Sequence, residues 1–271
     1  MPRPVTFLTD YGYADEYVGV CRAVIAERSP QSRIFDVTHG IKRHDVRSGA
    51  LVLRRSLPYF PAGIHLAVVD PQVGGERRGI AVRTADEDRI FVAPDNGLIS
   101  LAAQRFGGIV EAVDISGTPQ RLEPTAATFH GRDIFAPVAG HLAAGGHLSE
   151  CGSPLDPDEL VVLEMPLARA EGDQLITHAL TIDAFGNVTL DVEHAELAAF
   201  GLRLGQLLSV NGNDAPYVTS YIDVPIGSLL VYEDAYRSLA VAVNRGSAAA
   251  LLGRPATPLA DAVAVDVRAA A

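Results

Sequence analysis

The sequence contains a single lysine, Lys42, and only two cysteines, Cys21 and Cys151. Two cysteines so far apart form neither a metal-binding pair nor a disulfide framework, and we expect both to be buried, inert thiols. Positive charge is also scarce: 33 acidic residues oppose 22 basic ones, and the formal net charge is −11. A nucleic-acid binder needs a basic face for phosphates, so this balance argues against nucleic acid as a partner.

A long apolar run is missing as well. No stretch reaches the roughly 20 apolar residues that a bilayer-spanning helix needs, and residues 1–5 lack the apolar core of a signal peptide. We therefore expect no membrane association and a cytoplasmic location. Over 271 residues the chain is 48% hydrophobic and 20% charged, which is ordinary for a folded globular protein with a sizeable core.

The first half of the sequence alternates short apolar runs with helical patterns. The alternation predicts an α/β domain with a mostly parallel sheet flanked by helices. The expected strands are residues 5–9, 34–37, 64–69, 79–83 and 89–93, and the expected helices begin near Asp15 and Asn96 or cover 44–57 and 131–144.

The pattern changes after residue 152. Residues 152–158, Gly-Ser-Pro-Leu-Asp-Pro-Asp, are rich in turn formers and typical of a linker. Short strands then follow closely, which predicts a smaller, antiparallel β domain. They are expected at 174–182, 188–192, 206–210, 228–232, 239–243 and 262–267, with a short helix at 247–252. The predicted domains are residues 1–155 and 170–271.

Polar side chains follow two of the predicted strands. Asp10 and Asp70 each come directly after a buried strand, where open α/β sheets collect ligands. Asp10 is suited to accept hydrogen bonds from a ribose diol, or to cap the following turn. Asp70 enters a glycine-containing loop followed by Arg77 and Arg78, either of which can pair with it. A surface hairpin or a phosphate nest fits this loop too, although the P-loop ending is missing.

A third polar cluster is Thr128-Phe129-His130-Gly131, directly before a predicted helix. His130 is placed like a general base that a substrate backbone can approach closely, although a lone histidine is more often an ordinary polar residue. His130 and Asp133 also offer two metal ligands, which leaves a metallohydrolase as a third alternative. The other histidines lack metal-ligand spacing, and no metal is expected.

Two later segments carry further polar residues. Residues 94–98, Pro-Asp-Asn-Gly-Leu, lead from a strand into a helix. In the predicted β domain Asp183, Phe185 and Asn187 lie within five residues. Such a trio is able to bind an ammonium group, stack on a base and read a purine edge. A β-turn around a buried phenylalanine explains the same residues equally well.

Together these segments resemble one known family, the S-adenosyl-L-methionine hydrolases or hydroxide adenosyltransferases, which are hydrolytic relatives of the fluorinase and chlorinase. The resemblance runs in order from about residue 5 to residue 267. It is carried by Thr9-Asp10-Tyr11-Gly12, Val68-Val69-Asp70-Pro71, Gly75-Glu76-Arg77-Arg78, Pro94-Asp95-Asn96-Gly97-Leu98, Thr128-Phe129-His130-Gly131, Asp183-Ala184-Phe185-Gly186-Asn187 and Asn244-Arg245-Gly246-Ser247-Ala248-Ala249.

The resemblance implies an N-terminal α/β domain and a C-terminal antiparallel β-barrel. It implies a homotrimer whose active sites lie between the N-terminal domain of one subunit and the C-terminal domain of its neighbour. The implied reaction is attack of water on the ribose C5′ of S-adenosyl-L-methionine, which gives adenosine and L-methionine. Attack consumes the positive charge on sulfur, so no cofactor is expected.

Motif matching also implies roles for individual residues. Asp70, Arg77 and His130 match the set that positions and activates the water. The implied substrate-binding residues are Asp10 at the ribose hydroxyls, Asp183 at the methionine ammonium, Phe185 and Asn187 at the adenine, and also Asn96, Thr128, Phe129, Gly131 and Asn244. The chain departs from the pattern at Ala235, where relatives commonly carry a serine that touches the methionine end.

Two other functions compete with hydrolysis. A halogenase of the same fold uses chloride or fluoride, but the halogenases carry a tyrosine at the position of His130 and an extra loop in the first domain. A non-catalytic sensor of adenosine or S-adenosylmethionine has no use for the intact set of Asp70, Arg77 and His130. The sequence therefore predicts a hydrolase.

Overall fold

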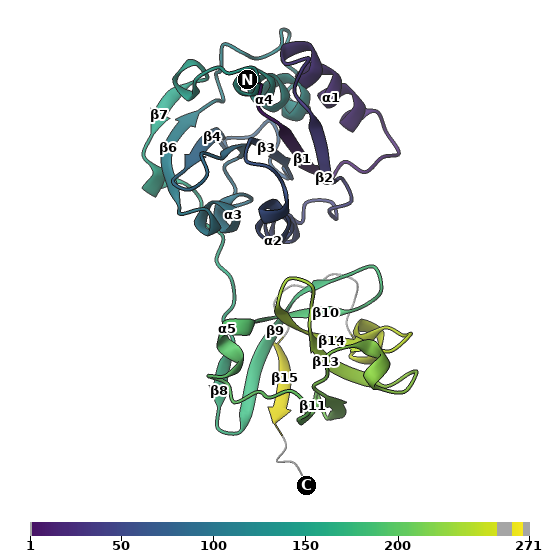
Figure 1. Ribbon diagram of the computed structural model, residues 1–271. Helices are drawn as coiled ribbons and strands as arrows, with labels where there is room; N and C mark the ends of the chain where they lie inside the picture. The colour runs from purple at the N-terminus through teal and green to yellow at the C-terminus, as the bar shows by residue number, and fades with distance from the viewer. Residues whose placement is uncertain (1, 254–261, 268–271) are drawn as a thin grey trace. The chain divides into compact units, whose positions relative to one another are not determined.

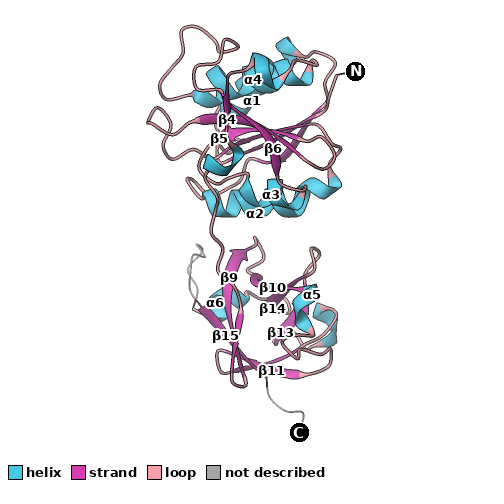
Figure 2. Ribbon diagram, turned by 90° about the vertical axis from the view of Figure 1, so that its left-hand side faces the viewer, coloured by secondary structure: helices cyan, strands magenta, loops and turns pink. Residues whose placement is uncertain are grey.

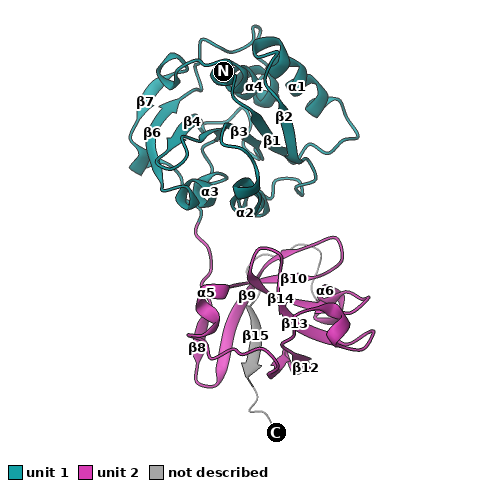
Figure 3. Ribbon diagram, in the orientation of Figure 1, with its two compact units in different colours: residues 1–163 teal, residues 164–271 magenta. Residues whose placement is uncertain are grey.

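The computed structural model describes residues 2–253 and 262–267 and divides into two compact units, residues 1–163 and 164–271 (Figures 1 and 3). Unit 1 holds one sheet and four α-helices. Its strands are β1 (Val5–Thr9), β2 (Ile34–Thr38), β3 (Ile64–Val68), β4 (Gly79–Thr84), β5 (Ile90–Pro94), β6 (Ile109–Asp114) and β7 (Ser153–Leu155). Its helices are α1 (Tyr17–Arg28), α2 (Val46–Ser56), α3 (Ser100–Arg105) and α4 (Ala136–Ala143).

The sheet of unit 1 is mixed rather than mostly parallel, which corrects the prediction. Its strand order is β2-β1-β3-β5-β4-β6-β7. The first four of these strands run parallel, whereas β4, β6 and β7 pair antiparallel. The connection from β4 to β5 consists of residues 85–89 alone. A parallel neighbour requires a crossover of about a dozen residues or more, so this short connection forces a hairpin.

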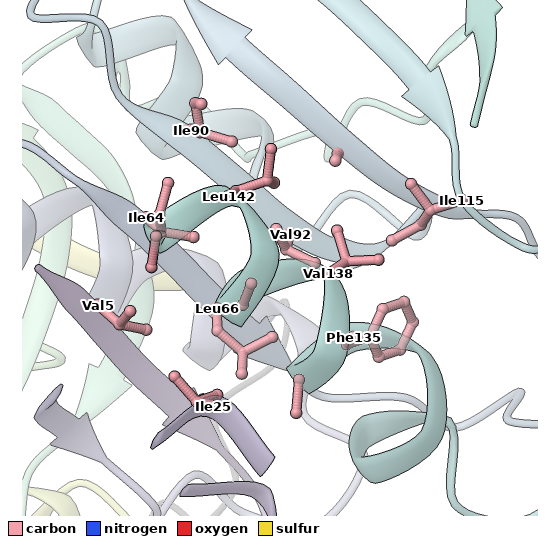
Figure 4. Packing of buried hydrophobic residues seen from close by; sticks show 14 of the residues in the cluster. Val5, Ile25, Ile64, Leu66, Ile90, Val92, Ile115, Phe135, Val138 and Leu142 are labelled. Carbon is pink, nitrogen blue, oxygen red and sulfur yellow. The ribbon is translucent and has the colours of Figure 1, made fainter. Parts of the chain in front are cut away.

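Helices cover both faces of the sheet, with α1 and α4 on one side and α2 and α3 on the other (Figure 2). Successive residues of β1 serve the two faces, since side chains alternate along a strand. Phe7 belongs to the core under α1 and α4, and Leu8 to the core under α2 and α3. Figure 4 shows Val138 and Leu142 of α4 packed over the strands in the first of these cores.

Part of the segment expected as a linker, residues 152–158, belongs to the first sheet instead. Ser153–Leu155 forms β7 and pairs with β6, with Leu155 opposite Ala112. Both strands were missing from the sequence prediction. Ser153 and Pro154 at this sheet edge are exposed, so β7 lacks the apolar alternation by which strands are recognised.

Both cysteines are buried and unbridged. Burial raises the pKa of each thiol, Cys21 and Cys151, to about 12, so neither is a thiolate at neutral pH. This agrees with the expectation of inert thiols. Within the described residues no helix is both long and apolar enough to cross a membrane.

Unit 2 is an antiparallel sheet curled on itself. Its strand order is β12-β11-β15-β9-β10-β14-β13, with β8 beside β9. Tyr217, next to β12, forms an isolated bridge with Val231 of β13, so the two ends of the strand order touch there. The strands are β8 (Arg169–Glu171), β9 (Gln174–Ile182), β10 (Val188–Glu193), β11 (Leu207–Val210), β12 (Asn213–Pro216), β13 (Leu229–Glu233), β14 (Ser238–Val243) and β15 (Ala262–Val267), and the helices are α5 (His194–Leu197) and α6 (Ala248–Leu251).

Candidate active site

A cleft of about 800 Å³ opens in unit 1 at the carboxyl ends of three neighbouring parallel strands. Its walls are the loops that follow β1, β2 and β3, together with residues 126–132. This is the edge at which α/β sheets bind ligands. Six residues predicted for the site line it: Asp10, Asp70, Thr128, Phe129, His130 and Gly131.

Asp10 holds one wall of the cleft through one carboxylate oxygen and leaves the other oxygen available as a hydrogen-bond acceptor. Its Oδ2 atom accepts a hydrogen bond from the backbone N–H of His44 at 2.9 Å. His44 has a left-handed backbone, with φ of 66°, a conformation that is costly for a residue with a side chain. Among the described residues Asp10 Oδ1 accepts no hydrogen bond, so it is available to a ligand in the cleft.

Asp70, Arg77 and His130 form one hydrogen-bonded cluster. Arg77 Nε donates to Asp70 Oδ1 at 2.9 Å, and Arg77 Nη2 donates to Asp70 Oδ2. The same Nη2 lies 3.0 Å from His130 Nδ1. The side chains of Arg77 and Asp70 are only 5% and 6% exposed, so this bidentate ion pair is well shielded from water. The structure thus brings together the three residues predicted to activate water.

A glycine allows the two loops of the cluster to meet. Gly74 has φ of +79°, and a Cβ atom there would lie 2.4 Å from the carbonyl oxygen of Ala127. Only glycine fits this close approach of the Asp70–Arg77 loop to the segment that carries His130. His130 itself directly precedes a π-helical turn, Gly131–Phe135, which continues into α4.

The contact with Arg77 fixes the protonation state of His130. A guanidinium has no acceptor, so His130 Nδ1 accepts the hydrogen bond and the neutral ring carries its hydrogen on Nε2. Burial first, and then the positive charge of Arg77, lower the pKa of His130, while Asp70 and Asp133 oppose them. The imidazole is therefore neutral at pH 7, with Nδ1 as its basic atom.

Asp133 does not complete a metal site with His130. Its buried carboxylate accepts hydrogen bonds from Arg132 at 2.6 and 2.9 Å and from the backbone N–H of Ala126 at 2.8 Å. Both oxygens are thus committed to holding the segment before His130. In the part of the chain that the structure describes, no three His, Cys, Asp or Glu residues are grouped to hold a metal ion. The contacts of Asp133 thus give the metallohydrolase alternative no support.

Asn96 lies outside the cleft lining. Its Nδ2 atom donates to the carbonyl oxygen of Val69 at 2.8 Å, and its Oδ1 atom accepts from Leu98 N–H at 3.2 Å. Asp95 beside it accepts from Arg78 and from the backbone of Val161. These contacts connect the residue after β3, Val69, with Val161 near the end of unit 1. A substrate-binding role of Asn96 stays a prediction.

The predicted residues of the second half meet within unit 2. Asp183 Oδ1 accepts from the backbone N–H groups of Phe185 and Asn187, each at 2.9 Å, and Oδ2 accepts from Asn187 Nδ2 at 2.8 Å. The segment is a tight turn, but Phe185 is 80% exposed rather than buried. Gly186 accepts from Ala249 N–H at 3.0 Å, which places the motif beginning at Asn244 beside this turn.

Tyr11 lines the cleft although sequence reasoning assigned it no role. Its ring packs edge-on against Phe129, with centroids 5.9 Å apart, and lies 5.8 Å from the ring of Tyr17. The sequence feature that could have indicated a role for Tyr11 is its place within the motif Thr9-Asp10-Tyr11-Gly12. His39 and Arg43, from the loop after β2, also line the cleft and were missed.

A mixed α/β unit with a cleft and an Asp–Arg–His cluster at its strand ends, followed by a curled antiparallel β unit, defines a two-unit protein of the α/β class. The chain belongs to the SAM hydroxide adenosyltransferase family: the N-terminal domain of that family matches residues 5–152, and its C-terminal domain matches residues 177–257. The family predicted from the motifs is thereby confirmed.

Several relatives cover nearly the whole chain. The (R)-S-adenosyl-L-methionine hydrolase of Salinispora tropica is 46% identical over 256 residues, which is 93% of this chain and 95% of that protein. The hydrolase of the same name from Thermus thermophilus is 38% identical over 265 residues, 93% of this chain and 96% of that protein. A fluorinase of Actinoplanes is more distant, at 29% identity over 273 residues, with 89% and 90% covered.

A solved structure shares the fold over the full length. A conserved protein of Thermotoga maritima superposes with a TM-score of 0.88 at 34% identity, covering 97% of this chain and 99% of that chain. The Thermus thermophilus structure that also matches has a TM-score of 0.77 at 35% identity, with 98% and 100% covered. Both units of this chain therefore have counterparts in known structures.

Proposed function

We propose that this protein hydrolyses S-adenosyl-L-methionine to adenosine and L-methionine in the cleft of unit 1. The observation that carries the proposal is the hydrogen-bonded cluster in which Arg77 joins Asp70 and His130, two residues that line that cleft. Relatives at 38–46% identity are named as hydrolases of this compound. The sulfonium leaves as a neutral thioether, so its departure needs neither an acid nor a metal.

The names of these relatives specify the (R) form of the substrate. A sulfonium sulfur with three different substituents is a stereocentre, so its two epimers point their methyl and methionine groups in different directions. We propose the (R) epimer as the preferred substrate here. A hydrolase restricted to that epimer leaves the (S) epimer intact.

The proposed nucleophile is a water molecule beside Asp70. Arg77 uses one lone pair on each Asp70 oxygen, and each carboxylate oxygen keeps a second one for a water hydrogen. The hydrogens of the water become more acidic as its oxygen attacks C5′, so a carboxylate that accepts from them favours the transition state over the ground state. Asp10 Oδ1 is left to hold the ribose hydroxyls, which orients C5′ toward the water.

One proton must leave when water becomes the 5′-hydroxyl of adenosine. His130 is neutral and accepts it at Nδ1, because Nε2 already carries a hydrogen. Arg77 gives up its contact with Nδ1 at this point and keeps both contacts with Asp70. A lowered pKa still suffices, since a protonated alcohol is a far stronger acid than an imidazolium. General base catalysis of this kind contributes about 10²–10⁴-fold.

The trio in unit 2 is proposed to complete the site in a homotrimer, with Asp183 at the methionine ammonium and Phe185 and Asn187 at the adenine. Support comes from Phe185, a large ring that is 80% exposed on a turn fixed by three hydrogen bonds. Asn244 donates to Val224 carbonyl oxygen at 2.8 Å and supports the neighbouring loop. A closed C-terminal barrel and a cytoplasmic location are further parts of this proposal.

Product analysis separates hydrolysis from its alternatives. The protein is incubated with each epimer in chloride, fluoride and halide-free buffer, and the products are resolved by chromatography. We expect equal amounts of adenosine and methionine, mainly from the (R) epimer and unchanged by halide. A 5′-halo-5′-deoxyadenosine contradicts hydrolysis and indicates a halogenase like the fluorinase relatives. Tight binding without turnover indicates a sensor.

A further inference from the structure

We infer that the Tyr11 hydroxyl positions the attacking water. The inference starts from the observation that this hydroxyl occupies the space that a side chain at residue 131 would otherwise fill. An ideal Cβ atom built on Gly131 would lie 2.1 Å from Tyr11 Oη. The hydroxyl therefore occupies the cleft wall at the residue next to His130, and glycine at 131 makes room for it. The inference rests on the proposed hydrolysis and adds a residue to it.

The position of the Tyr11 ring is fixed from several sides. The backbone N–H of Tyr11 donates to Thr9 Oγ1 at 3.1 Å, and Gly12 N–H donates to the carbonyl of His39 at 2.8 Å. The ring packs against the core under α1 and α4 and against Phe129. A hydroxyl held in this way has a defined location, as the orientation of a reacting water requires.

The chemical state of the hydroxyl suits a water-holding role. Burial above all, and then acidic neighbours that include Asp10 and Asp70, raise the pKa of Tyr11 well above its ordinary value. The phenol is thus neutral throughout the working range. Within the described residues Tyr11 Oη has no hydrogen-bond partner, so its lone pairs are free to accept from a water in the cleft. Like Asp70, such an acceptor gains strength as the attacking water becomes acidic.

Moving the hydroxyl from one residue to the other tests the inference. The first variant, Tyr11→Phe, keeps the ring and removes only Oη. We expect kcat to fall by about 10-fold, the worth of one hydrogen bond to the reacting water, with KM within about twofold of the wild type. The double variant Tyr11→Phe, Gly131→Ser places the serine Cβ near the vacated Oη position, 3.1 Å from the ring Cζ, with its hydroxyl beside that position, and should recover part of the lost kcat. Gly131→Ser alone should be impaired, because its Cβ collides with Oη.

Tyr13→Phe is the matched control. Tyr13 lies two residues away, is 68% exposed, and its hydroxyl donates to Asp36 at 3.4 Å outside the cleft. This variant should keep the kcat of the wild type. Thermal unfolding should show the same midpoint for Tyr11→Phe and the wild type, which separates positioning from a general loss of structure.

The outcomes distinguish this inference from the proposed function. Absence of wild-type turnover with either epimer overturns the proposed function, and the role of Tyr11 falls with it. An active wild type with an equally active Tyr11→Phe variant overturns the role of Tyr11 alone. The inference is equally wrong if Tyr11→Phe raises KM at unchanged kcat.

Discussion

Arg77 lies 3.0 Å from His130 through Nη2 and Nδ1, and the direction of this hydrogen bond is fixed because arginine can only donate. The ring is therefore neutral, with its hydrogen on Nε2. In the proposed mechanism His130 therefore acts as a base at Nδ1 once Arg77 has given up this contact. Because Arg77 is always charged and His130 is neutral, we expect kcat to depend on pH through His130 and on the shape of the side chain at residue 77.

The pH dependence of kcat should follow His130. Burial and Arg77 lower the pKa of the ring, so we expect kcat to be level at pH 7 and to fall on acidification through an apparent pKa below 6.5. Initial rates at saturating substrate between pH 4.5 and 8 measure this. The His130→Ala variant should lose about 10²–10⁴-fold in kcat, with little change in KM, and lose the inflection. An inflection above pH 6.5, or one that survives in this variant, excludes His130 as its source.

Arg77→Lys should show that shape matters beyond charge. Lysine keeps the positive charge but lacks the planar fork that reaches both Asp70 oxygens and His130 together. We expect kcat to fall by about 10²-fold. Arg78→Lys serves as the control: Arg78 pairs with Asp95, away from the cleft lining, so its kcat should stay within about twofold of the wild type. Equal losses in both variants would argue for a structural effect.

The stability of unit 1 should depend on pH through His65. This ring is buried between Thr6 Oγ1 at 2.7 Å and Arg89 Nη1 at 3.1 Å. Burial first, and then the charge of Arg89, lower its pKa from 6.5 to about 3. The unfolded chain binds a proton below pH 6.5 while the folded chain does not, so acid removes stability between these two values.

Comparison with His65→Gln isolates this contribution. The free energy of unfolding of the wild type, relative to that of the variant, should shrink by up to roughly 1.4 kcal/mol per pH unit as the pH falls from 6 to 4. Urea unfolding at pH 4.5, 5.5 and 7 measures it. A difference between the two proteins that does not change with pH contradicts a neutral, buried His65.

Mixing inactive subunits tests the shared site of the proposed trimer. Asp10→Ala and Asp183→Ala each remove one predicted substrate contact, one in each unit. If an active site takes Asp10 from one chain and Asp183 from another, mixed oligomers should regain some activity. Subunit exchange is verified separately with two affinity tags. Mixed oligomers that form but stay inactive would show that both residues serve the same site from one chain.

Much of the cleft was predictable because it follows from strand order. Asp10 and Asp70 each end a buried strand, and the parallel neighbours β1 and β3 bring these ends to one edge of the sheet. Sequence periodicity identifies such strands well. The antiparallel half of the sheet was missed where its signals were weak: β7 is short, polar and exposed, and the direction of β4 depends on a short connection rather than on its own residues.

Other features arise only from packing between distant residues. The sequence shows Tyr11 and Gly131 separately, and nothing in either segment indicates that a phenol fills the space over a glycine 120 positions away. The resemblance implies a substrate-binding role for Asn96, and the sequence gives no sign that its amide also donates a hydrogen bond to the carbonyl oxygen of Val69. Hydrogen-bond partners of this kind require coordinates.

The central claim is that water attacks C5′ of the sulfonium substrate in this cleft. Turnover of the (R) epimer in ¹⁸O-labelled water, followed by mass spectrometry of the nucleoside, tests it most directly. We predict adenosine that carries ¹⁸O as its 5′-oxygen, formed in equal amount with methionine, and a rate reduced about 10²–10⁴-fold in His130→Ala. Unlabelled adenosine, or a nucleoside without a 5′-oxygen, would contradict it.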